Sequence, residues 1–135
     1  MLRSFAVVLV AAVCVSAAPA GGAVSCSLSN GAVVVLRSSD FDPDVLVWDS
    51  RQRAIDYVNG NFKNASEVLE HTVLSKPGTR AVVIACDPGS SKPRYSSIAL
   101  DTVGIKITTG PNRGRYGWVS SGDAHTGDTA GPMVQ

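Results

Sequence analysis

The sequence predicts an α+β fold in which two short helices pack beside a strongly bent antiparallel sheet. Helix-start signals and helical spacing of apolar residues are confined to residues 49–72. Short β-branched runs and alternating segments lie on both sides of this part, separated by turns that contain Gly, Pro or Asn. Strands and helices that are grouped rather than alternating are typical of α+β domains.

Two short strands are expected ahead of the helices. Residues 32–37 (AVVVLR) form an apolar, β-branched run after an Asn-Gly pair, and residues 45–48 (VLVW) resume extended character. The segment between them, SSDFDPD at residues 38–44, has the composition of a turn.

This turn holds an acidic triplet, Asp40, Asp42 and Asp44, at the spacing of calcium-loop ligands. Val45 stands where such a loop needs a glycine, and Arg51 stands where it needs a bidentate glutamate. We therefore interpret the triplet as a solvated turn and expect no metal there.

The first helix is expected after Asp49-Ser50, which offers an N-cap ahead of RQRAIDYV. Ala54, Ile55 and Val58 fall on one side of that helix at the spacing of a buried face.

A second helix is expected to start at Asn64, with Glu67 at the reciprocal capping-box position. Its apolar face continues through Val68 and Leu69. Asn64-Ala65-Ser66 is also a glycosylation sequon, which matters only in a host that glycosylates.

The chain turns to β structure after the helices. Residues 80–86 (RAVVIAC) predict a buried strand, residues 87–94 an exposed loop, and residues 96–110 a long alternating strand. The apolar residues of that strand occupy every second position, but the alternation shifts by one residue between Leu100 and Val103, which predicts a bulge or bend.

Two further features belong to this half of the chain. Gly104 inside the strand agrees with a bend or with close approach of a neighbouring backbone. Beyond Ser120 the sequence is polar, Gly-rich and without period, so residues 122–135 are expected to form a disordered tail.

The N-terminus predicts export. One positive charge at Arg3 precedes an unbroken apolar run over residues 5–15, and small residues follow near Ala20 and Ala23. This is the pattern of a secretory signal peptide over residues 1–23. Cleavage leaves roughly 112 to 115 residues, enough for one domain over residues 24–121, and the mature protein is expected to be secreted or periplasmic.

Cysteine usage fits that compartment. Cys14 leaves with the signal, so Cys26 and Cys86 remain as an even pair, and we predict a disulfide between them. Two separate buried thiols are the alternative. The bridge would contribute roughly 4 kcal/mol by closing a long loop. No Cys-x-x-Cys or Cys/His cluster is present, so neither a metal nor another cofactor is expected.

The stretch GIKITTGPNRGRYGWV at residues 104–119 carries a resemblance to known barrels. Gly117-Trp118-Val119 resembles the Gly-aromatic-aliphatic step near the end of Src homology 3-type small β-barrels. Ile105 to Ile107, continued through Gly110, Gly114 and Gly117, is similar to the KOW pattern of ribosomal and transcription-associated barrels. In both families this pattern makes one tight hairpin of a five-stranded barrel.

The order of motifs also resembles bacterial extracytoplasmic barrels of this kind, since Pro77-Gly78-Thr79 precedes the strand and the hairpin. The resemblance covers about residues 74–121 and implies a small, bent, Src homology 3-like antiparallel barrel. It implies no particular ligand, because the Ala-Leu-Tyr-Asp-Tyr signature of proline-rich-peptide binders is absent and Ser120 replaces their usual Pro.

Four residues of the hairpin are candidate ligand contacts: Trp118, Tyr116, Arg113 and Arg115. Basic side chains beside an aromatic ring are typical of anion sites. The alternative is a solvated hairpin tip with Trp118 in the core. The chain has 12 basic and 11 acidic residues, so no net field recruits nucleic acid or an anionic membrane.

The sequence motifs give little support for a catalytic function. His71 and His125 are the two histidines, and the chain has neither a Gly-x-Ser-x-Gly elbow nor a His-Glu-x-x-His helix. We expect an exported, non-catalytic binding or structural module whose partner is a protein or a cell-envelope component, with no nucleic acid and no membrane span in the mature chain. A small secreted enzyme or enzyme inhibitor, with a site on residues 87–94, is the alternative.

Overall fold

The computed structural model describes residues 25–39 and 42–127. The expected signal peptide and residues 128–135 of the expected tail lie outside the described residues. The described part contains β1 (Val33–Leu36), β2 (Val45–Trp48), α1 (Arg51–Val58), α2 (Ala65–His71), β3 (Thr72–Ser75), β4 (Arg80–Ser91), β5 (Leu100–Ile107), β6 (Tyr116–Ser120), the 3₁₀ helix η1 (Ser121–Asp123) and β7 (Ala124–Thr126).

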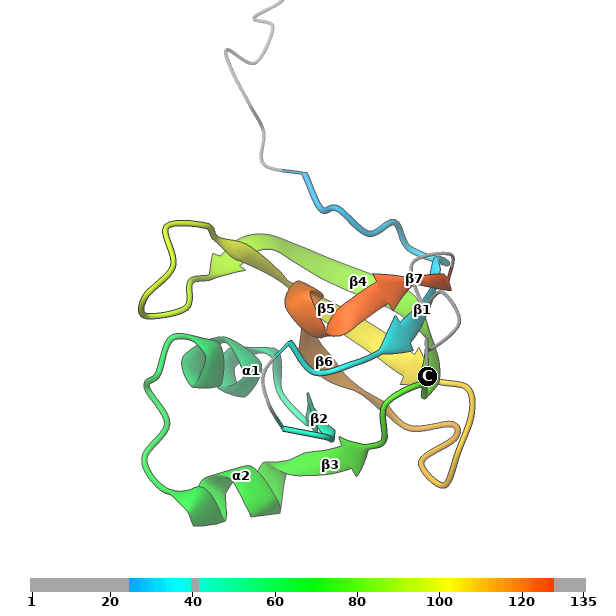
Figure 1. The fold of residues 1–135 in the computed structure, drawn as a ribbon, viewed down its shortest axis with the longest axis horizontal. Helices are drawn as coiled ribbons and strands as arrows, with labels where there is room; N and C mark the ends of the chain where they lie inside the picture. The colour runs from blue at the N-terminus through cyan, green and yellow to red at the C-terminus, as the bar shows by residue number, and fades with distance from the viewer. Residues whose placement is uncertain (1–24, 40–41, 128–135) are drawn as a thin grey trace, which may run out of the picture.

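All seven strands belong to one antiparallel sheet with the order β3-β2-β6-β5-β4-β1-β7. The sheet curls into a half-barrel, and the two helices lie beside it at one end (Figure 1). The predicted α+β class, the antiparallel bend and the two short helices within residues 49–72 are confirmed. None of the helices in the described part is long and apolar enough to cross a membrane.

The core lies on the concave face of the sheet. Alternate residues of β5, Val103, Ile105 and Ile107, are fully buried there, as the two-residue period of a strand requires. Val34 and Val119 reach the same core from β1 and β6. Burial of such side chains stabilises the fold by roughly 1.5–3 kcal/mol each.

Helix α1 packs on the opposite face of the sheet. Ser50 caps it, with its hydroxyl accepting a hydrogen bond from the Arg53 N–H at 3.4 Å. Ala54 and Ile55 are its buried residues, and the ring of Tyr57 packs against Trp48 at the end of β2. The capped, amphipathic helix expected here is confirmed.

Helix α2 begins as expected but packs less. The Asn64 carboxamide oxygen accepts from the Glu67 N–H at 3.0 Å, while the Glu67 carboxylate accepts from the Lys63 N–H instead of the cap residue. The expected buried face is wrong, because α2 has no buried residue and Leu69 is 74% exposed.

The predicted exposed loop at residues 87–94 is wrong for its first half. Strand β4 continues to Ser91, since Asp87 pairs with Thr102 and Ser91 pairs with Leu100. Register shifts between Val83 and Ala85 and between Asp87 and Ser91 place the extra residues of this bent hairpin in β4. The irregularity expected from the parity of β5 therefore lies in its partner strand.

The predicted disordered tail is also wrong at its start. Residues 121–126 form η1 and β7, and β7 pairs with β1 through His125 and Val35. The Ser120 hydroxyl accepts from the Gly122 N–H at 3.2 Å and so starts η1. A three-residue polar strand has no period of its own, and pairing with a distant strand defines it.

The predicted disulfide is confirmed. Cys26 and Cys86, 60 residues apart, are bonded and attach the segment before β1 to β4. Asp101 strengthens the same junction, because its carboxylate accepts from the Ser27 N–H at 3.0 Å and from the Gly89 N–H at 2.9 Å.

Candidate functional site

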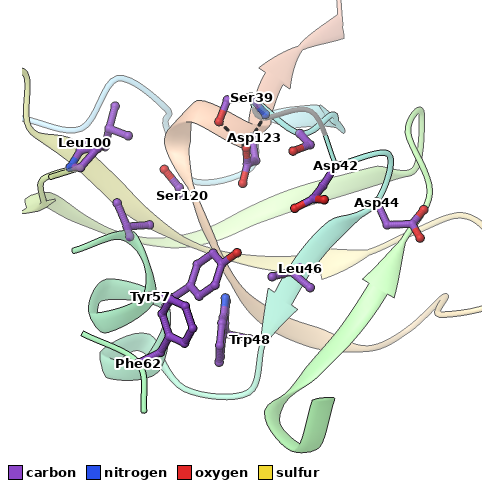
Figure 2. A pocket seen from close by; sticks show the side chains of 14 residues that line it. Ser39, Asp42, Asp44, Leu46, Trp48, Tyr57, Phe62, Leu100, Ser120 and Asp123 are labelled. Carbon is purple, nitrogen blue, oxygen red and sulfur yellow. Dashed lines mark hydrogen bonds between the residues drawn. The ribbon is translucent and has the colours of Figure 1, made fainter. Parts of the chain in front are cut away.

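A pocket of about 280 Å³ lies between β2, α1 and the segments that follow β1, β4 and β6 (Figure 2). We call it the aromatic pocket. Its walls combine aromatic rings, carboxylates, serines and small apolar side chains. The lining residues are Ser38, Ser39, Asp42, Asp44, Leu46, Trp48, Ala54, Tyr57, Val58, Phe62, Pro93, Leu100, Ser120 and Asp123.

Three rings form a continuous row along one wall. The centroids of Trp48 and Tyr57 are 5.2 Å apart, and those of Tyr57 and Phe62 are 5.1 Å apart, each pair in a tilted arrangement. Trp48 comes from the end of β2, Tyr57 from α1, and Phe62 from the loop after α1 (Figure 2). Phe62 is 43% exposed, so the row runs from the sheet to solvent.

Trp48 is the innermost member of this row. Its side chain is 3% exposed, yet its indole nitrogen is directed into the pocket (Figure 2). No acceptor in residues 25–39 and 42–127 receives a hydrogen bond from this N–H. The N–H is not one of the buried polar atoms that lack a partner, so it is accessible from the pocket and offers a donor to a ligand.

The other wall is acidic. Asp123, from η1, accepts hydrogen bonds from the Ser39 N–H at 2.8 Å and from the Ser39 hydroxyl at 2.9 Å. The Asp42 carboxylate points toward the pocket interior, while the Asp44 carboxylate points outward (Figure 2). No lysine, arginine or histidine occurs among the described residues that line this pocket. The pocket is therefore electrostatically suited to a cation.

The candidate contacts of the β5–β6 hairpin are only partly brought together. Tyr116 is 62% exposed, and the Lys106 ammonium lies 5.5 Å from its ring centroid. Arg115 and Tyr116 line a second, more open pocket of about 370 Å³ with His71. Arg113 lies in the turn before β6.

Trp118 has a packing role in the sheet. It pairs with Trp48 across β2 and β6, and its ring lies over Gly104, where a Cβ atom would be 3.3 Å from the ring. The groups nearest to Gly104 are therefore side chains, the Trp118 ring and the Ala85 Cβ atom at 3.1 Å, rather than the neighbouring backbone that was expected there.

His71 is bonded rather than free. Its Nδ1 atom lies 2.7 Å from the Asp49 carboxylate, and the Asp49 N–H donates to its backbone carbonyl at 2.9 Å. This pair connects the end of α2 to the end of β2.

A cluster of possible metal ligands consists of Cys26, Cys86 and Asp101. The two sulfurs are joined in the disulfide and offer no thiolate. Burial raises the pKa of Asp101, but hydrogen bonds from Ser27 and Gly89 outweigh it and hold the pKa below its ordinary value. This cluster is a structural junction.

Sequence reasoning did not place Trp48 or Tyr57 among the candidate ligand contacts, and it interpreted the acidic turn before β2 as solvated. Both groups face the aromatic pocket. One signal in the sequence could have indicated this site: Asp42 and Asp44 come just before the strand that ends at Trp48, so the carboxylates and the indole ring are close along the chain.

Comparison of the chain with protein-family models, curated proteins and solved structures gave no match.

Proposed function

We propose that this protein is an exported, non-catalytic binding module that holds a basic segment of a protein or cell-envelope component in the aromatic pocket. We further propose that its scaffold is a Src homology 3-like barrel. The strand order β7-β1-β4-β5-β6, with η1 between β6 and β7, supports a five-stranded barrel of that kind. The segment containing β2, α1, α2 and β3 is then an insertion after the first barrel strand.

The indole N–H of Trp48 is the observation that carries the proposal. This N–H is open to the pocket rather than sealed in the core, since the Ser75 hydroxyl is the buried side-chain polar atom without a partner in the described part of the chain. A ligand carbonyl in the aromatic pocket would accept this hydrogen bond in place of water, with a net gain of about 0.5–1.5 kcal/mol. A peptide ligand supplies such an acceptor, because its backbone carbonyls lie next to apolar groups of its side chains.

The negative charge of the aromatic pocket favours a basic ligand segment. Asp42, Asp44 and Asp123 line the pocket, and the Asp42 carboxylate faces the ring row. An arginine or lysine side chain there would stack on the rings and pair with a carboxylate at once. The volume of about 280 Å³ suits one or two residues rather than a bulky cofactor.

The location of the protein is also a proposal. The signal-like residues 1–23 motivate export, and the Cys26–Cys86 disulfide is compatible with an oxidising compartment. A partner would therefore be met outside the cytoplasm.

Two matched octapeptides test the function. One alternates Arg and Ala, the other alternates Glu and Ala, and both are blocked at their ends. Calorimetric titration into the secreted protein should give saturable binding of the basic peptide and none of the acidic peptide. Equal binding of both peptides, or of neither, would contradict the proposal.

Asp42→Asn and Arg51→Gln form the variant pair for this experiment. Asp42→Asn removes a pocket charge, and we expect affinity for the basic peptide to fall about tenfold, as for a charge-assisted contact of about 1.4 kcal/mol. Arg51 is paired with Asp87 at 3.2 Å and does not line the pocket as described, so Arg51→Gln should bind like wild type.

A further inference from the structure

The outer face of β1 and β4 carries two neighbouring arginines. Val35 is paired with Arg80 across the antiparallel strands, and Arg37 follows Val35 by two residues, so the three side chains share one face. Diagonal neighbours on such a face have Cα atoms about 7–8 Å apart. The backbone fixes both positions, since the Arg37 N–H donates to the Asp123 carbonyl at 2.9 Å and the Arg80 N–H donates to the Thr109 hydroxyl at 2.8 Å.

Neither guanidinium has an acidic partner within the described residues. The ion pairs there involve Arg51, Arg53 and His71. The pair therefore offers its donors to an anion from outside the chain.

The same two arginines border a concave, mainly apolar cavity of about 500 Å³. Val35, Pro43 and Pro77 supply its apolar walls, and the turn at Gly78 closes one side. Asp42 also touches this cavity, but its carboxylate is directed toward the aromatic pocket (Figure 2). The two arginine side chains thus place positive charge at the edge of an apolar cavity.

We propose that this cavity is a second ligand site, which adjoins the aromatic pocket at Ser38 and Asp42, for a single anionic amphiphile. The acidic head binds between Arg37 and Arg80, because guanidinium groups bind carboxylates and phosphates through paired hydrogen bonds. The apolar body lies against Val35, Pro43 and Pro77. A free molecule is the chosen occupant because the site is a cavity of ligand size and the chain has a net charge of only +1.

Sodium decanoate at concentrations below micelle formation is the probe, followed by amide NMR of the secreted protein. We expect saturable shifts at Val35 and Gly78. Decyltrimethylammonium has a similar apolar body with the opposite charge, and it should leave these resonances unmoved. Non-saturable shifts, or equal shifts with both amphiphiles, would overturn the proposal.

Arg80→Gln and Arg37→Gln keep side-chain length and remove the charge, and each should weaken decanoate binding at least tenfold. Arg113→Gln, at the tip of the β5–β6 hairpin, is the matched control and should bind like wild type. Unchanged affinity in folded Arg37 and Arg80 variants would refute the site. Binding to phosphatidylglycerol vesicles without binding of monomeric decanoate would also refute it, in favour of a membrane surface.

Discussion

The Asp49 carboxylate lies 2.7 Å from Nδ1 of His71, and the backbone N–H of Asp49 donates to the His71 carbonyl. The two residues are 22 positions apart, and their contact attaches α2 to the end of β2. Helix α2 has no buried residue, so this contact takes the place of an apolar interface.

His71→Ala should therefore lower the free energy of unfolding by about 0.5–1.5 kcal/mol, the net value of one partly exposed hydrogen bond. Urea unfolding measures this difference. Glu70→Ala changes the exposed neighbour in the same helix and should stay within about 0.5 kcal/mol of wild type. Equal stability of both variants would show that the pair contributes nothing.

Asp101 should make stability depend on acid pH. Burial raises the pKa of its carboxyl, but hydrogen bonds from the Ser27 and Gly89 N–H groups and the Ser27 hydroxyl hold it below the ordinary value of 3.8. The pKa of Asp101 is therefore lower in the folded chain than in the unfolded chain. The ionised carboxylate stabilises the fold at pH values above 3.8, and this stabilisation is lost as the pH falls through the folded pKa.

Urea unfolding of wild type and Asp101→Asn across the acid range tests this dependence. The stability difference should be constant above about pH 5 and should shrink below it. Parallel curves over the whole range would contradict the assigned role of Asp101.

Gly117 allows β2 to approach β6. A Cβ atom there would be 2.8 Å from the Trp48 carbonyl oxygen and would collide with a Val47 methyl group. Gly117→Ala should destabilise the fold by about 2–3 kcal/mol, as overpacking does.

Gly114 is the matched control for that change. Its φ angle is +89°, but a Cβ atom there would meet nothing within 4 Å. Gly114→Ala should cost about 1–2 kcal/mol through backbone strain alone. Thermal or urea unfolding that ranked Gly117→Ala as the milder variant would contradict the close packing of β2 on β6.

Ser75 offers a stabilising substitution. Its side chain is 2% exposed, and its hydroxyl has no hydrogen-bond partner within the described part of the chain. Ser75→Ala should raise the free energy of unfolding by up to about 1 kcal/mol, because it removes an unsatisfied buried group. Ser91→Ala should lower it, since that equally buried hydroxyl donates to the Leu100 carbonyl at 3.3 Å. Destabilisation by Ser75→Ala would mean that the hydroxyl is satisfied.

Local signals were sufficient for much of the fold. Ser50 and Asn64 cap the helices as their residue types predict, and the single even cysteine pair is joined. The pairing of strands that lie far apart in the chain could not be predicted from the sequence. β7 exists because Ala124 and His125 lie against β1, and β4 extends past Asp87 because β5 continues to pair with it. Neither pairing leaves a periodic pattern in the segment concerned.

The aromatic pocket was missed for a related reason. Trp48 ends an apolar strand in the sequence, and its side chain is buried like that of a core residue. The role proposed for it depends on the direction of one N–H group and on carboxylates contributed from η1 and the turn before β2. Those directions follow from tertiary structure, which sequence periodicity does not encode.

The indole N–H of Trp48 tests the central claim most directly. Trp48 and Trp118 are the two tryptophans, so the ¹⁵N-labelled protein has two indole resonances, which Trp118→Phe assigns. Titration with the basic octapeptide should move the Trp48 indole resonance downfield and saturably, because the N–H gains an acceptor, and should move that of Trp118 far less. Trp48→Phe, which lacks the N–H, should remain folded and lose the peptide. A Trp48 indole resonance that stays in place while the peptide binds would contradict the account.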